Sequence, residues 1–274
     1  MASWAFSIRG QAPRWATMVL GVLPIVLLLS IWWAITHGEP EFRQISPTIL
    51  PSPGEVFGYL PELMSRSDSE TGSNMLLHHI LASGQRVVLG FLLALVVVLP
   101  IGIGMGAFAS IRATFSPLAT MSGYIPIATL VPLTMSWFGT DEKQKIIFLA
   151  MAFAIYLLPL IVKAIDSVPD VFLRTAQTLG ATRPQIIFRV LVPIAAPDLW
   201  HAMRLAFGVG WTYIVLTEAL VQTDGLGFMI EVARRRGPRE QIYLVIMIIT
   251  VIAWLADLIW VRIGHRLFPY RQVR

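Results

Sequence analysis

The residues best suited to chemistry in this chain lie inside a long apolar run, residues 194–221. Four ionisable side chains interrupt it, namely Asp198, His201, Arg204 and Glu218. Charged groups in an apolar span are expensive to bury, so they usually line a pathway or pair with one another. At about 100° per residue, one face of a helix in this run would gather five side chains. They are His201, Arg204, Gly208, Trp211 and Glu218.

This face has two interpretations. It could line a solute pathway, with an aromatic ring, a glycine and charged groups facing a polar interior. Alternatively, Arg204 and Glu218 could pair with neighbouring helices and hold a bundle together. The two lie about 21 Å apart along a helix, so each needs a different partner. In the last apolar run, Asp257 is expected to pair with a nearby arginine in a structural role.

The composition identifies the elements that carry these residues. Hydrophobic residues make up 56% of 274 and charged residues 14%, and mean hydropathy is +0.70. About 20 apolar residues cross the hydrocarbon core of a bilayer as a helix. The sequence therefore predicts an all-α integral membrane protein with a single domain over 1–274. The predicted spans are 17–36, 87–109, 114–138, 145–163, 194–221 and 242–262.

Glycine and proline residues refine the second and third spans. The second is expected to continue a helix that starts near Leu76. Its Gly102 and Gly106 form a small-residue pair that permits close helix packing, either within the subunit or at a dimer seam. The third span contains Pro117, Pro126 and Pro132. Proline frees backbone carbonyls that neighbouring helices must satisfy, so this span is expected to pack inside the bundle.

A helical hairpin is predicted over 166–193, between the fourth and fifth spans. Asp170 suits the positive end of a helix dipole. Gly180 suits a helix C-terminus, where a positive φ costs little without a side chain. Arg183-Pro184 then begins a second helix, because proline is well placed in a first turn. Lysine and arginine counts beside the spans favour cytoplasmic termini, which puts this hairpin in the cytoplasm.

The hairpin resembles the EAA loop of ABC importer permeases. That loop reads Glu-Ala-Ala, three residues, Gly, nine residues, then Ile-x-Leu-Pro, and its coupling helix docks into the ATPase subunit. The chain departs from the pattern with an arginine for the glutamate and a threonine for the first alanine. The resemblance implies that coupling to the ATPase involves Arg174, Thr175, Ala176, Gly180 and Pro193.

Further segments resemble the nitrate/sulfonate/taurine branch of these permeases. They include Leu50-Pro51-Ser52-Pro53, Trp137-Phe138-Gly139 and Gly225-Leu226-Gly227. The resemblance implies a six-helix type I ABC importer transmembrane domain in the bacterial inner membrane, acting by alternating access on a small anion such as nitrate, taurine or an alkanesulfonate. It also implies three kinds of protein partner: ABC ATPase subunits, a second permease copy forming a homodimer, and a periplasmic or lipid-anchored substrate-binding protein.

Several functions lack their motifs. The sequence contains no phosphate-cradling Gly-x-x-x-x-Gly-Lys-Ser/Thr, so ATP and Mg²⁺ would bind to the partner ATPase, and we expect no cofactor in this chain. We identify no catalytic constellation and no metal site; His78 and His79 are expected at the surface. The net charge is +5, and the basic residues flank the apolar runs, which indicates membrane topology rather than nucleic-acid binding. A secondary transporter would typically show inverted repeats, and none is evident; a membrane-embedded enzyme is the third alternative.

Overall fold

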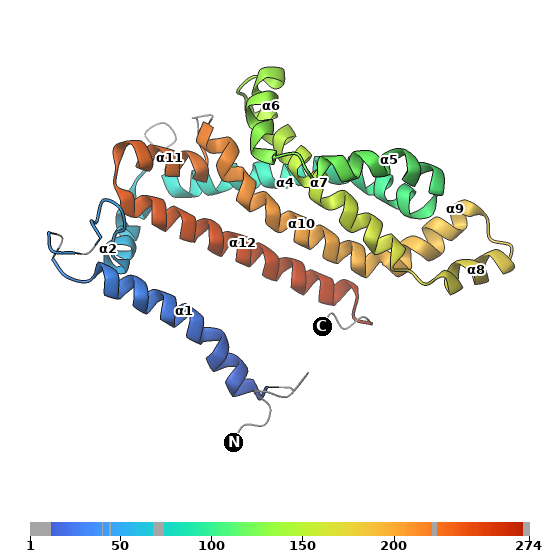
Figure 1. Cartoon of the computed structure of the whole chain (residues 1–274), viewed down its shortest axis with the longest axis horizontal. Helices are drawn as coiled ribbons and strands as arrows, with labels where there is room; N and C mark the ends of the chain where they lie inside the picture. The colour runs from blue at the N-terminus through green and yellow to red at the C-terminus, as the bar shows by residue number, and fades with distance from the viewer. Residues whose placement is uncertain (1–11, 40, 44, 68–73, 221–223, 271–274) are drawn as a thin grey trace. The chain divides into compact units, whose positions relative to one another are not determined.

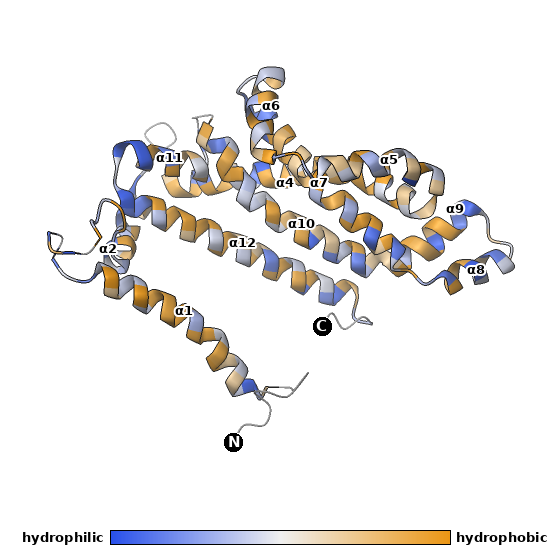
Figure 2. Cartoon of the chain, viewed as in Figure 1, coloured by the Kyte–Doolittle hydropathy of each residue, from blue (hydrophilic) through white to orange (hydrophobic). Residues whose placement is uncertain are grey.

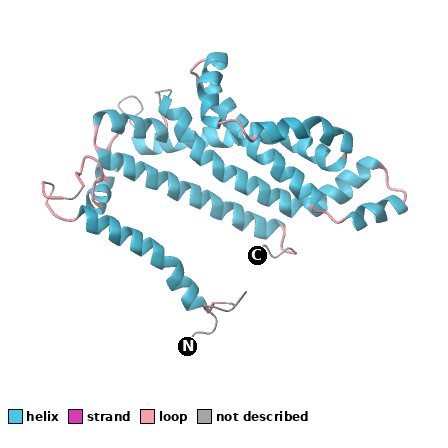
Figure 3. Cartoon of the chain, in the orientation of Figure 1, coloured by secondary structure: helices cyan, strands magenta, loops and turns pink. Residues whose placement is uncertain are grey.

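The computed structural model describes residues 12–39, 41–43, 45–67, 74–220 and 224–270, and its regular elements there are helices (Figure 3). An isolated bridge joins Ser67 to Asn74. The helices, labelled in Figure 1, are α1 Arg14–Thr36, α2 Pro53–Gly58, α3 Leu60–Ser65, α4 Met75–Ala107, α5 Ala109–Ser122, η1 Ile127–Thr129, α6 Leu130–Phe138, α7 Glu142–Asp166, α8 Asp170–Thr178, α9 Arg183–Ile186, η2 Ile187–Leu191, α10 Val192–Leu220, α11 Leu226–Arg236 and α12 Arg239–Leu267.

Five of these helices are long and apolar enough to cross a membrane, and a bent pair could supply a sixth crossing. Figure 2 shows apolar residues along most of α1 and α12, with hydrophilic residues gathered at α8 and α11. The chain divides into two compact units. One comprises residues up to 66 with 233–244, and the other comprises 67–232 with 245–274.

The first unit holds α1 and the polar segment after it. Trp32 donates its indole N–H to the carbonyl of Pro51 at 2.9 Å, and Tyr243 donates its hydroxyl to the carbonyl of Ile49 at 2.8 Å. These bonds fasten the segment that precedes α2 both to α1 and to the start of α12. The polar segment also forms two short helices, α2 and α3.

A capping arrangement starts α2. The carboxylate of Glu55 accepts from the backbone N–H of Ser52 at 2.7 Å, and the Ser52 hydroxyl accepts from the N–H of Glu55 at 3.3 Å. Arg43 forks onto the same carboxylate, with N–O distances of 3.0 and 2.9 Å. This guanidinium lowers the pKa of Glu55 to about 2, because it stabilises the ionised form.

In the second unit, α4 and α7 pack closely and run parallel. A Cβ added at Gly102 would come within 2.5 Å of Ile161, and one at Gly106 within 2.2 Å of Ile165. Gly90 approaches Leu149 in the same register. The contacting residues therefore advance in the same direction along both helices. Gly102 and Gly106 allow α4 to pack closely against α7 within the subunit.

The predicted third span is broken rather than continuous. Helix α5 and the η1–α6 segment meet at an angle of 87°, at a turn that ends in Pro126. Proline favours extended backbone at the residue before it and donates no N–H, which fits a break in the helix at this point. No described α5 side chain is buried in the chain, which differs from the expected internal position. Because α4 and α7 run parallel, the segment between them must return to the side where α4 began.

Helix α10 runs antiparallel to α7, and α12 runs antiparallel to α10. Gly210 faces the ring of Phe153 on α7. Trp200 on α10 donates to the carbonyl of Trp260 on α12 at 3.1 Å and fills the space beside Gly264. The second unit thus has two ends: one carries the α8–α9 hairpin, and the other carries the starts of α4 and α7.

Candidate functional site

The hairpin between α7 and α10 has the geometry that its sequence predicts. Helix α8 begins at Asp170 and ends in a left-handed turn, with φ of +76° at Gly180. The N–H of Ala181 donates to the carbonyl of Ala176 at 3.0 Å, and that of Gly180 donates to Gln177 at 2.9 Å. This pair of bonds is a Schellman motif, which satisfies the last carbonyls of a helix.

The second arm of the hairpin continues into a membrane span. Helix α9 starts at Arg183, where the Thr182 N–H donates to the Gln185 side chain at 2.8 Å. The following η2 segment, Ile187–Leu191, winds as a π-helix just before Pro193. Proline lacks the N–H that the regular helical ladder needs, so a wider turn at this point fits its chemistry.

The hairpin exposes apolar side chains at a polar surface. Ala176 and Ile186 are buried at its base, whereas Arg174, Thr175 and Gly180 are exposed. Exposed apolar residues surround them, with exposed fractions of 61% for Val171, 81% for Leu179 and 70% for Phe188. Such a surface is suited to contact with another protein. Pro193, where the hairpin joins α10, is also exposed.

The structure separates the five side chains predicted to share one face of α10. Arg204 makes a bidentate ion pair with Asp257 of α12, with N–O distances of 2.5 and 2.7 Å. Trp211 and Glu218 are buried, while His201 and Gly208 are exposed. The pair between Arg204 and Asp257 matches the expected structural role of the aspartate, and it favours the helix-pairing interpretation for the arginine.

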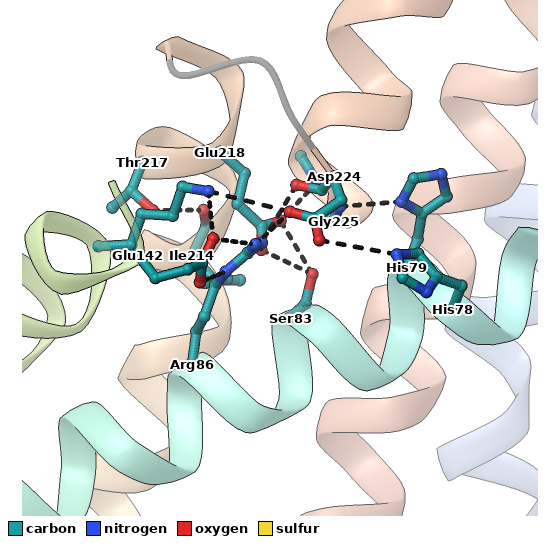
Figure 4. Close-up of polar contacts among 12 residues, drawn as sticks. His78, His79, Ser83, Arg86, Glu142, Ile214, Thr217, Glu218, Asp224 and Gly225 are labelled. Atoms are coloured by element: carbon teal, nitrogen blue, oxygen red, sulfur yellow. Dashed lines mark hydrogen bonds and ion pairs between the residues drawn. The ribbon is translucent and has the colours of Figure 1, made fainter. Parts of the chain in front are cut away.

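A buried ionic cluster lies at the end opposite the hairpin, and Arg86 is its centre (Figure 4). Its guanidinium donates to Glu142 at 2.7 and 2.6 Å and to Glu218 at 2.6 Å, and it also contacts Asp224. Lys145 donates to Glu142 at 2.7 Å. The cluster therefore joins α4, α7, α10 and the segment before α11. Its two cations and three carboxylates leave a net charge of −1.

Glycines and small polar groups complete the shell around Glu218. Its carboxylate accepts from the Ser83 hydroxyl at 2.8 Å and from the N–H of Gly227 at 2.9 Å. A Cβ at Gly225, whose φ is +106°, would lie 2.2 Å from the carboxyl carbon, so only glycine leaves room there. His79 is 5% exposed and accepts from the N–H of Gly225 at 2.9 Å, which corrects the expected surface position of this histidine.

Sequence reasoning does not find this cluster, because Arg86 lies just before the predicted span 87–109 and nothing in its neighbourhood singles it out. The available signal is that Arg86 and Glu218 are both ionisable residues in apolar runs, which must find partners of opposite charge. Among the described residues, no group of three or more His, Cys, Asp or Glu side chains is placed to hold a metal ion.

Long apolar spans with an exposed helical hairpin between α7 and α10 define an integral membrane protein that offers a surface to a partner protein. Residues 87–269 match the family model described as the binding-protein-dependent transport system inner membrane component. The chain belongs to this family. Its members are membrane components of ABC importers and are not themselves enzymes, so the chain is a permease subunit that works with a separate ATPase and a substrate-binding protein.

Known permeases are similar to this chain over most of its length. The chain is 31% identical over 263 residues to the taurine transport system permease protein TauC of Escherichia coli K12, covering 96% of this chain and 92% of TauC. It is 28% identical over 254 residues to the putative aliphatic sulfonates transport permease protein SsuC of Bacillus subtilis 168, covering 92% and 87%. Among solved structures, an inward-facing MetNI methionine ABC transporter matches with a TM-score of 0.64 at 20% identity, covering 73% of this chain and 99% of that chain.

Proposed function

We propose that the chain carries a small oxyanion-bearing solute of the taurine, alkanesulfonate or nitrate class. Two relatives support the sulfonate part of this class, since their names describe permeases for taurine and for aliphatic sulfonates. The competing idea of a self-sufficient secondary transporter has no relative in its favour among these proteins, and the family membership argues for ATP-driven transport.

The observation that carries the ATP-driven part of the proposal is the exposed hairpin of residues 170–193. We assign the ATPase contact to the exposed Arg174, Thr175 and Gly180, with the buried Ala176 packing behind them and Pro193 ending the loop. The Schellman turn at Gly180 fixes the direction in which α8 projects, and the exposed Leu179 and Phe188 offer apolar area for burial. Arg174 replaces the acidic residue of the EAA pattern, so its partner on the ATPase would be an acidic or carbonyl group.

A second copy of the chain is expected to complete the pathway. In agreement with a partner outside the chain, none of the 18 residues in the most apolar stretch of helix α1 is buried.

We place the hairpin and both termini on the cytoplasmic side. A cysteine at Thr182 should then be protected in intact cells from an impermeant thiol reagent, while one at Thr48 should react. The chain has no cysteine of its own, so each label reports one site.

The decisive experiment combines purification with uptake. The tagged chain, expressed with the ATPase and binding protein encoded beside it, should retain the ATPase through purification. In proteoliposomes the complex should import radiolabelled taurine, ethanesulfonate or nitrate only with ATP and the binding protein. Uptake of all three without ATP would refute an ATP-driven importer. ATP-dependent transport of a different solute class would refute only the proposed substrate.

A further inference from the structure

Two adjoining cavities follow the line where α7 packs against α10. The first, about 530 Å³, lies beside the break between α5 and η1, and the second, about 320 Å³, lies nearer the hairpin. Leu160 lines both, so the two cavities adjoin at this residue along the helix pair. We call the two together the α7–α10 groove. The 87° bend at Pro126 makes room for its first cavity, since Ile125, Pro126 and Ile127 form one wall.

Two tyrosine hydroxyls are the polar side-chain groups of the first cavity. Tyr156 of α7 and Tyr213 of α10 place their oxygens 3.1 Å apart, and the walls around them are otherwise glycine, proline, leucine and isoleucine. When one hydroxyl donates to the other, the second O–H stays free to donate. Both can also rotate towards a common acceptor. Two donors at this spacing suit a group with several oxygens, such as a sulfonate or nitrate.

The cations on α10 and α4 are already engaged elsewhere. Arg204 is paired with Asp257, and Arg86 is surrounded by carboxylates. The first cavity therefore offers neutral donors, and its described lining holds no charged side chain. A pathway must bind its solute strongly enough to admit it and weakly enough to release it. Neutral hydroxyls meet that condition for an anion better than an unpaired guanidinium would.

The second cavity leads to the hairpin end of the unit. Lys163 and Asp198 supply one charge of each sign, His201 adds an imidazole ring, and the Ser167 hydroxyl donates to Asp198 at 2.9 Å. The groove thus passes from neutral donors through an apolar section at Leu160 to a charged mouth. This order suits release of a charged solute into water at the hairpin end.

We propose that the α7–α10 groove carries the transported solute, and that Tyr156 and Tyr213 bind its oxyanion group through their hydroxyls. The proposal rests on the oxyanion class proposed above. Its alternative is that the pair only joins α7 to α10, with the groove packed shut and closed to solute in the assembled complex. The helix pair already packs closely elsewhere, where Phe153 meets Gly210, so the hydroxyls are available for another task.

The test uses the complete complex of permease, ATPase and binding protein. Tyr156→Phe with Tyr213→Phe keeps both rings and removes both hydroxyls. We expect the maximal rate of taurine or ethanesulfonate uptake to fall about tenfold, which corresponds to ~1.4 kcal/mol, while complex yield and ATP hydrolysis stay unchanged. Fewer solute molecules are then carried for each ATP hydrolysed. Tyr270→Phe, an exposed tyrosine outside the groove, is the matched control and should transport normally.

A labelling experiment separates a solute path from a covered surface. In the assembled complex, the Leu160→Cys variant should react with a sulfonate-bearing methanethiosulfonate, and the reaction should stop uptake. The Leu157→Cys variant, whose altered position is fully buried, should not react. Unchanged transport per ATP in the double tyrosine variant would overturn the inference, as would a Leu160→Cys variant that does not react. If the unmodified complex imports no sulfonate or nitrate, the proposed function fails instead, whatever the tyrosine variants do.

Discussion

Replacing Arg86 with methionine should destabilise the fold strongly, because this side chain is the centre of the buried ionic cluster. It is 3% exposed and holds three carboxylates, one of which, Glu218, is fully buried. Methionine keeps most of the volume and changes the cluster charge from −1 to −2. Breaking a buried pair by removing one partner costs about 3–5 kcal/mol. At about 2–4 °C per kcal/mol, the midpoint of thermal unfolding should drop by roughly 6–20 °C.

The assay is thermal unfolding of the purified complex in detergent, followed by intrinsic tryptophan fluorescence. Arg112→Met is the matched control, because Arg112 and its partner Asp166 are each 42% exposed and such pairs contribute only about 0–1 kcal/mol. Adding Glu218→Met to Arg86→Met should recover part of the loss, since the stranded buried charge is removed. A midpoint for Arg86→Met equal to that of Arg112→Met would refute this account of the cluster.

Three further predictions concern other parts of the chain. Gly180→Val should abolish co-purification of the ATPase, because a branched side chain disfavours a φ of +76°. Gly180→Asn, whose side chain tolerates this conformation, should retain the ATPase. Normal docking of the valine variant would count against the coupling role of the hairpin. Gly106→Leu should lower the yield of folded protein, because its Cβ would lie 2.2 Å from Ile165, whereas Gly21→Leu, with open space around it, should express normally. The pKa of Glu55 is lowered to about 2, so its pairing with Arg43 stabilises the fold fully above about pH 5 and is lost as pH falls from there towards 2. The protection factor of the Ser52 amide, which is its exchange rate relative to the intrinsic rate at the same pH, should fall over that range, and Arg43→Met should already show reduced protection at pH 7.

Local features of the fold can be predicted from sequence because their causes are local. The apolar runs, the helix start at Asp170, the Gly180 turn and the proline in the first turn of α9 each depend on a few adjacent residues. The third span shows the limit of this reasoning. Its prolines predict an interruption, but the 87° angle depends on how the segments on either side pack.

The ionic cluster depends on contacts between distant parts of the chain. Arg86 and Glu218 are 132 residues apart, and a helical wheel of α10 alone assigns Glu218 to the same face as Arg204. A helical wheel is insufficient because it gives only the angle of each side chain around one helix. The helices that pack against α10 change from one end of it to the other. Near the hairpin α10 meets α12 at Asp257, and near its end it meets α4 at Arg86.

The helix from Arg183 to Leu220 is continuous over 38 residues, and this gives the subunit a lever arm. Its first turns belong to the hairpin, and Glu218 sits about 53 Å further on. A tilt of about 5° at the hairpin would displace Glu218 by about 5 Å over that length. The Arg86–Glu218 contact is 2.6 Å long, so it would break under such a tilt. The π-turn before Pro193 lies between the hairpin and the cluster, so bending there would decide how much of a hairpin tilt reaches the Arg86–Glu218 contact.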